Sequence, residues 1–176
     1  MSLRVVEVIE HNDEWQRNFN QEKSLLSGVL EASNVAQIHH IGSTSVEGLC
    51  AKPIIDILLE VHSLEELDAN TKEMESLGYE AKGEFGIEGR RYFQKSAEKR
   101  THQVHAFLLD SRQAKRHLAF RDYLRAFPDI ASEYGRIKKE AAAMCQNDIE
   151  VYMDYKDGFI KEHEAKALEW IKYQKA

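Results

Sequence analysis

Residues 38–57 read IHHIGSTSVEGLCAKPIIDI, and the fold of the whole chain is interpreted outward from this stretch. It begins inside a strand predicted over residues 35–41, which ends in one glycine and three hydroxyl residues, Gly42–Ser45. A second, strongly apolar strand follows over residues 54–61 and carries Asp56. Glycine lets a backbone approach a ligand closely, and successive N–H and hydroxyl groups bind phosphate oxygens. The pattern therefore predicts a phosphate-binding loop, with Gly42, Ser43, Thr44 and Ser45 as phosphate contacts.

Asp56 strengthens this interpretation, because a carboxylate inside an apolar strand is costly to bury unless it is paired or bound to a metal. Twelve residues separate Ser43 from Asp56. A phosphate chain held by the loop would thus lie close to a carboxylate that can hold Mg²⁺. The alternative to a binding loop is that this stretch forms two ordinary strands joined by a glycine turn. A Gly-Ser pair by itself would favour this alternative.

The rest of the chain predicts a mixed sheet flanked by helices, an α+β or α/β fold. We expect one domain over residues 1–176, with the sheet in residues 1–110 and helices in residues 111–176. The predicted helices cover residues 13–31, 63–77, 112–127, 129–146 and 151–173. The predicted strands outside the quoted stretch are residues 4–9, a hairpin within 79–95, and residues 101–109, where Gln103, His105 and Phe107 share one face.

Composition narrows the functional classes. The 176 residues carry a net charge of −6 and are 43% hydrophobic, which suits a globular chain and disfavours general binding to nucleic acid or to anionic membranes. We find no signal peptide and no uninterrupted apolar segment of about 18 residues. Cys50 and Cys145 match no disulfide or metal spacing. The expected location is cytoplasmic, and the oligomeric state is open.

Residues 38–61 resemble the signature of the GrpB family, whose pattern reads approximately His-Ile-Gly-Ser-Thr-x-Val-x-Gly-Leu-x-Ala-Lys-Pro-x-Ile-Asp-Ile. The resemblance continues through residues 100–105, 117–125, Tyr134 with Lys138, and 155–160. Domains of this family are placed in the nucleotidyltransferase fold superfamily, and some are fused to dephospho-CoA kinases. The resemblance therefore implies a nucleotidyltransferase-like mixed sheet with a C-terminal helical part and a site near Gly42, Ser43 and Asp56.

Basic residues in and around the matched motifs suggest a phosphate clamp, because guanidinium and ammonium groups bind phosphate well. These residues are Lys52, Arg91, Arg121, Arg125, Lys138 and Lys156. Taken one at a time, the residues other than Lys52 are better explained as parts of solvated helix faces. Their joint presence predicts that at least two belong to the site.

One departure weakens the catalytic interpretation. Nucleotidyltransferases generally carry two acids on one face of a strand, and here the second position is Leu58. Glu60 lies on the same face two residues further on, and His105 stands where a third acid would be expected. We therefore expect Asp56 and His105 as catalytic candidates, and Asp56 with Glu60 as Mg²⁺ ligands.

Three functions remain open from the sequence. The first is a nucleotidyltransferase-like protein that binds a nucleoside triphosphate or related phosphorylated small molecule and transfers a nucleotidyl group with Mg²⁺. The second is a non-catalytic domain that binds such a ligand, which Leu58 favours. The third is a hydrolase that uses His105 and Asp56 with one transition metal.

Overall fold

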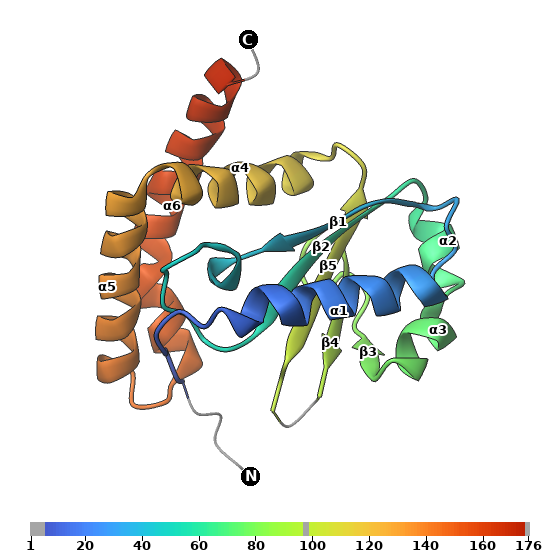
Figure 1. The fold of residues 1–176 in the computed structure, drawn as a ribbon, viewed down its shortest axis with the longest axis horizontal. Helices are drawn as coiled ribbons and strands as arrows, with labels where there is room; N and C mark the ends of the chain where they lie inside the picture. The colour runs from blue at the N-terminus through green and yellow to red at the C-terminus, as the bar shows by residue number, and fades with distance from the viewer. Residues whose placement is uncertain (1–5, 97–98, 175–176) are drawn as a thin grey trace.

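The structure is a computed structural model that describes residues 6–96 and 99–174, and it contains a five-stranded mixed sheet (Figure 1). The strands are β1 (Val35–Ile41), β2 (Ile55–Val61), β3 (Tyr79–Ala81), β4 (Arg91–Lys95) and β5 (His102–Leu108). Their order across the sheet is β1-β2-β5-β4-β3. β2 and β5 run parallel, and every other neighbouring pair is antiparallel.

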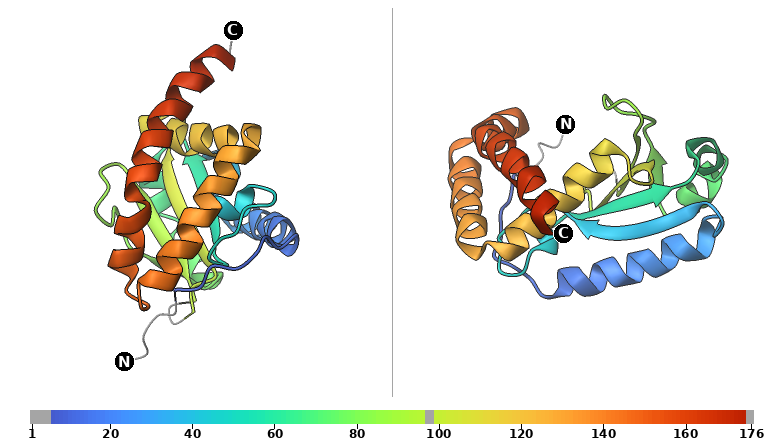
Figure 2. Two further views of the ribbon diagram at one scale, coloured as in Figure 1. Left: turned by 90° about the vertical axis from the view of Figure 1, so that its left-hand side faces the viewer. Right: turned by 90° about the horizontal axis from the view of Figure 1, so that it is seen from above.

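Helices cover both faces of this sheet. They are α1 (Glu14–Val29), α2 (Leu64–Asp68), α3 (Thr71–Ser76), α4 (Arg112–Ala126), α5 (Pro128–Met144) and α6 (Ile149–Gln174), with a short 3₁₀ turn, η1 (Ser43–Ser45). The right-hand view of Figure 2 shows α1 and α4 on opposite faces of the sheet, with α5 and α6 beyond one end of it. The mixed sheet with flanking and C-terminal helices confirms the predicted α+β fold class.

The alternation of side chains along β2 builds a separate core on each face. Ile57 and Leu59 are fully buried among residues of α1, including Leu26. Leu58 is fully buried on the other face, where it packs with Ala114 of α4. Since side chains two apart on a strand share a face, Asp56 also faces the C-terminal helices.

The described part of the first predicted strand, residues 6–9, does not belong to the sheet. Residues 4 and 5 of that segment lie outside the described residues, and Ile9 makes only an isolated antiparallel bridge to Ala51. The backbone N–H of Val6 donates instead to the side chain of Asn147. The N-terminal segment thus connects to the loop before β2 and to the turn before α6.

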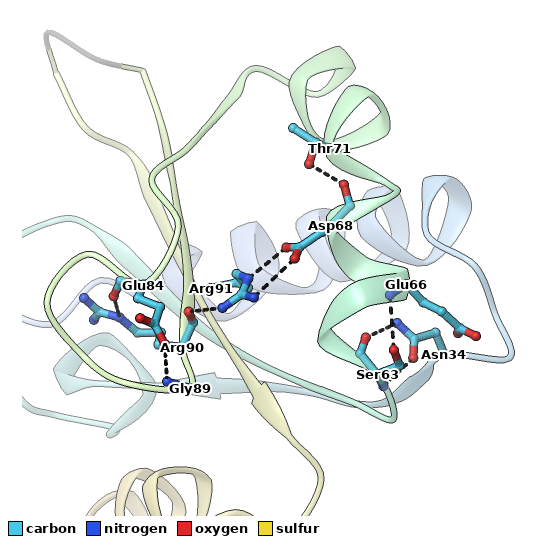
Figure 3. A network of polar contacts seen from close by, with 9 residues as sticks. All are labelled: Asn34, Ser63, Glu66, Asp68, Thr71, Glu84, Gly89, Arg90 and Arg91. Carbon is cyan, nitrogen blue, oxygen red and sulfur yellow. Dashed lines mark hydrogen bonds and ion pairs between the residues drawn. The ribbon is translucent and has the colours of Figure 1, made fainter.

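The helix predicted over residues 63–77 is interrupted and forms α2 and α3. Ser63 caps α2 by accepting from the N–H of Glu66, as the Ser-x-x-Glu pattern predicts (Figure 3). The Ser63 N–H, however, donates to the side chain of Asn34 rather than to Glu66. The interruption falls at Asn70, whose backbone leaves helical geometry and whose side chain accepts from the N–H of Glu31 just after α1.

Candidate functional site

A cavity of about 260 Å³ lies where the sheet meets the C-terminal helices. Its lining comes from the loop between β1 and β2, from β2 and β5, and from α4, α5 and α6. Eight of the residues predicted for the site line it: Gly42, Ser43, Thr44, Lys52, Asp56, His105, Lys138 and Lys156. The structure therefore brings together the loop, the strand carboxylate and three lysines. The first and last of these lysines are about a hundred positions apart in the sequence.

Gly42 and Asp56 are in direct contact at the floor of this cavity. Gly42 has φ +73° and ψ −176°, a conformation that is essentially restricted to glycine. A Cβ atom at position 42 would lie 2.7 Å from Asp56 Oδ2. Glycine is therefore required both for the turn and for the position of the carboxylate.

The turn that begins at Gly42 is held from behind by polar contacts. The Ser45 hydroxyl donates to the Gly42 carbonyl oxygen, and Arg125 of α4 donates to the Ser45 carbonyl oxygen at 2.8 Å. Thr44 Oγ1 lies 2.9 Å from His40 Nε2. Burial lowers the pKa of His40 to about 4, so this ring is neutral near pH 7. Ser45 and Arg125 thus support the loop and do not line the cavity.

Asp56 is oriented by hydrogen bonds that all reach one of its oxygens. His105 Nε2 lies 3.2 Å from Asp56 Oδ1, and His105 Nδ1 lies 3.4 Å from a guanidinium nitrogen of Arg90. Because a guanidinium can only donate, Nδ1 accepts and the ring proton is on Nε2, which donates to Asp56. The Gln103 amide, oriented to satisfy its neighbours, also donates to Oδ1 at 2.8 Å. Asp56 Oδ2 therefore remains directed toward Gly42 and the cavity.

Three lysines supply positive charge to the cavity. Lys138 is 1% exposed, and its Nζ has no hydrogen-bond partner among the described residues. Burial, with the nearby Lys156, lowers the pKa of Lys138 to about 7. Burial, with the nearby Lys52, lowers the pKa of Lys156 to about 8. The Nζ atoms of Lys52 and Lys156 lie 5.2 and 4.7 Å from the centre of the Tyr152 ring, which holds both over one side chain.

Glu60, Arg91 and Arg121 do not line this cavity. Glu60 is four residues from Asp56, about 13 Å along the strand, and accepts from His39 and from the N–H of Asp110. Arg91 forms a two-pronged contact with Asp68 of α2, at 2.8 and 3.2 Å (Figure 3). Arg121 bonds to Asp122 and to the carbonyl oxygen of His40. These three residues stabilise neighbouring elements and do not enter our proposal.

The sequence interpretation did not identify Gln103, His117 or Tyr152 as lining residues. Gln103 could have been found, because it shares a face of β5 with His105 and pairs in register with Asp56. His117 gives no comparable signal, since its position depends on how α4 crosses the sheet. Burial lowers the pKa of His117 to about 3, so this ring is neutral near pH 7.

The side chains that line the cavity could take part in the binding of a single metal ion but not of two. Within the described ranges, no group of three or more His, Cys, Asp and Glu side chains could hold a metal ion. Leu58, at the position of the second acid, is fully buried. A pair of metal ions does not fit this site, whereas a single Mg²⁺ held by Asp56 Oδ2 and by the oxygens of a bound phosphate does.

Four other hollows among the described residues are larger, and in the two largest of them an arginine is already bound within the protein. One, of about 660 Å³, lies between α1 and α4, and its Arg125 is bound to the turn carbonyl. The other, of about 790 Å³, lies beside α4 and α6, and its Glu60 and Arg121 are paired as described above. No helix in the described part of the chain is long and apolar enough to cross a membrane.

Comparisons of the sequence and of the structure with known proteins agree on one family. Residues 5–166 match the family described as GrpB protein. The chain is 48% identical over 169 residues to the UPF0157 protein YqkA of Bacillus subtilis, covering 96% of this chain and 49% of that protein. It is 35% identical over 160 residues to the glutamate-rich protein GrpB of Alkalihalophilus pseudofirmus, covering 88% and 91%.

The crystal structure of GrpB from Enterococcus faecalis matches with a TM-score of 0.90 and 46% identity, and the match covers 96% of this chain and 99% of that one. The chain thus spans about half the length of the Bacillus subtilis relative but nearly all of the Enterococcus faecalis protein.

Proposed function

This chain belongs to the GrpB family, and from the cavity at the start of β2 we propose that it binds a nucleoside triphosphate or a related phosphorylated small molecule. The observation that carries the proposal is Lys138, whose buried Nζ lines the cavity without a hydrogen-bond partner among the described residues. Lys138 Nζ lies 4.7 Å from the centre of the Tyr134 ring, which attracts a cation but accepts no ordinary hydrogen bond. A buried amine without a hydrogen-bond acceptor is costly, and a phosphate oxygen would supply the missing acceptor.

The other lining residues have compatible roles. Gly42, Ser43 and Thr44 line the same cavity, and in this proposal the Gly42 backbone and the two hydroxyls contact phosphate oxygens. Lys52 and Lys156 neutralise the charge of the phosphates. Mg²⁺ enters with the ligand, coordinated by phosphate oxygens and by Asp56 Oδ2.

The proposal is binding rather than nucleotidyl transfer. Transfer by two metal ions requires a second acid beside Asp56, and a buried leucine occupies that position. Asp56 and His105, in this proposal, orient a bound Mg²⁺–phosphate complex, and His105 acts by holding Asp56.

Calorimetric titration tests the proposal with ATP, GTP, CTP, UTP and coenzyme A precursors, each with and without Mg²⁺. We expect Lys138→Met to weaken binding about 10- to 100-fold, the size of a lost hydrogen bond between charged groups. Asp56→Ala should remove only the part of the affinity that depends on Mg²⁺. Lys139→Met is the matched control, because Lys139 is the next residue of α5 but is exposed. The proposal fails if no ligand binds, or if Lys138→Met and Lys139→Met behave alike.

A further inference from the structure

The cavity is small for a whole nucleotide. Its volume is about 260 Å³, whereas sites that enclose a drug-sized ligand occupy roughly 300–1,000 Å³. The charged groups that line it are one carboxylate, Asp56, and three ammonium groups, those of Lys52, Lys138 and Lys156. A cavity of this size and charge fits a compact polyanion.

The aromatic rings that line the cavity are already in contact with other groups. Lys52 and Lys156 lie over the Tyr152 ring. The His105 ring packs against Tyr92 and His117, with ring centres 5.4 and 5.6 Å apart. Recognition of a base by stacking needs a ring face that can receive it. These contacts occupy part of each ring and disfavour the stacking of a base on them.

Two neutral polar side chains that could read the edge of a base, those of Gln103 and His105, are paired within the protein. The amide of Gln103 donates to Asp56 and accepts from Tyr92 and Arg100. Both ring nitrogens of His105 are paired, one with Asp56 and one with Arg90. The ammonium of Lys138 lines the cavity, has no hydrogen-bond partner among the described residues, and is complementary to an anion.

We infer that this cavity recognises the di- or triphosphate group of its ligand and not the base, an inference that rests on the proposed function. The remainder of the ligand lies outside the cavity and adds little to the affinity. Inorganic pyrophosphate and tripolyphosphate are therefore ligands in their own right, and the four nucleoside triphosphates bind with equal affinity.

The test compares tripolyphosphate, pyrophosphate, the four nucleoside triphosphates and adenosine by calorimetry, in one buffer at about 0.15 M salt to screen nonspecific attraction. We expect tripolyphosphate and every nucleoside triphosphate to have dissociation constants within about threefold of one another, and adenosine not to bind. Tripolyphosphate should displace ATP with a stoichiometry of one. Lys138→Met and Lys156→Met should each weaken all of these ligands in parallel, and Lys139→Met should change none.

The outcomes separate this inference from the proposed function. If one nucleoside triphosphate binds more than about threefold tighter than tripolyphosphate and still depends on Lys138, the base is read and the inference fails while the proposed function stands. If tripolyphosphate binds and no nucleotide does, phosphate recognition stands and the nucleotide proposal fails. If neither binds the wild-type protein, both fail. Thermal unfolding of each variant shows whether lost binding reflects lost folding.

Discussion

Gly42 places the backbone of the loop between β1 and β2 against Asp56, and the substitution Gly42→Ala tests that contact. The new Cβ would lie 2.7 Å from Asp56 Oδ2 at a backbone φ of +73°. We expect a loss of about 1–3 kcal/mol in the free energy of unfolding, measured by urea denaturation, and loss of the Mg²⁺-dependent affinity. Gly158→Ala in α6 is the control, because its Cβ would meet nothing within 4 Å. That change should stabilise the protein by about 0.5–1 kcal/mol. Equal effects of the two substitutions would contradict this account of Gly42.

Lys138 should lower the stability of the protein in the absence of ligand. Its pKa falls from 10.5 when unfolded to about 7 when folded, so the folded state disfavours the charged form. The resulting cost grows as the pH falls from 10.5 to about 7 and is constant below that. Lys138→Met keeps the shape and removes the amine, and should raise the free energy of unfolding by about 1–4 kcal/mol at pH 6.

The same comparison at pH 10 should show a much smaller gain, because this pH is close to the unfolded pKa of 10.5 and the unfolded lysine then loses its proton at little cost. Urea denaturation at both pH values measures the difference, with Lys139→Met as the variant expected to change neither. A destabilised Lys138→Met protein at pH 6 would show that Lys138 has a stabilising partner and would remove the main support for an anion site.

At the residue scale, the predicted residues that are contiguous in the sequence are the ones that the structure best brings together in one candidate site. Gly42, Ser43, Thr44, Lys52 and Asp56 lie within 15 positions and line one cavity. Glu60 and Arg91 were predicted for the site and lie elsewhere, bound to His39 and to Asp68. Residue type shows that a side chain can bind phosphate or metal, but its direction is set by strand register and by the pairing of neighbours.

At the element scale, the periodic segments were predicted closely and the local interruptions were not. β1 has the predicted bounds, residues 35–41, and α4 differs from its predicted range by one residue. The division between α2 and α3 depends on Asn70, which bonds to Glu31, 39 positions away. Such a contact leaves no periodic signal in the sequence, because it joins side chain and backbone across the fold.

At the scale of the whole molecule, the cavity exists only because the sheet and the C-terminal helices meet. β2 and the preceding loop supply Asp56 and Lys52, whereas α5 and α6 supply Lys138 and Lys156. Packing between the two parts excludes water from both helical lysines, which are 1% and 9% exposed. The lowered pKa values are therefore a property of the assembled fold and absent from the isolated elements.

This arrangement predicts that affinity for phosphate ligands decreases as the pH rises. Lys138 and Lys156 have pKa values of about 7 and about 8 in the protein without ligand, and a bound phosphate raises both by stabilising the charged ammonium. Binding thus takes up protons, and each lysine that has lost its proton must regain it. A terminal phosphate has its second pKa near 6, so its own charge is nearly constant above pH 7.

We therefore expect the affinity for tripolyphosphate to fall at least about tenfold between pH 7 and pH 9, measured by calorimetry without Mg²⁺. Repeating the titration in buffers of different ionisation enthalpy should show net proton uptake at pH 8. Lys138→Met should bind more weakly and show a shallower decline, because only Lys156 then titrates. Affinity that is constant or rises over this range would mean that the two lysines do not contact the ligand, even if the ligand binds elsewhere on the molecule.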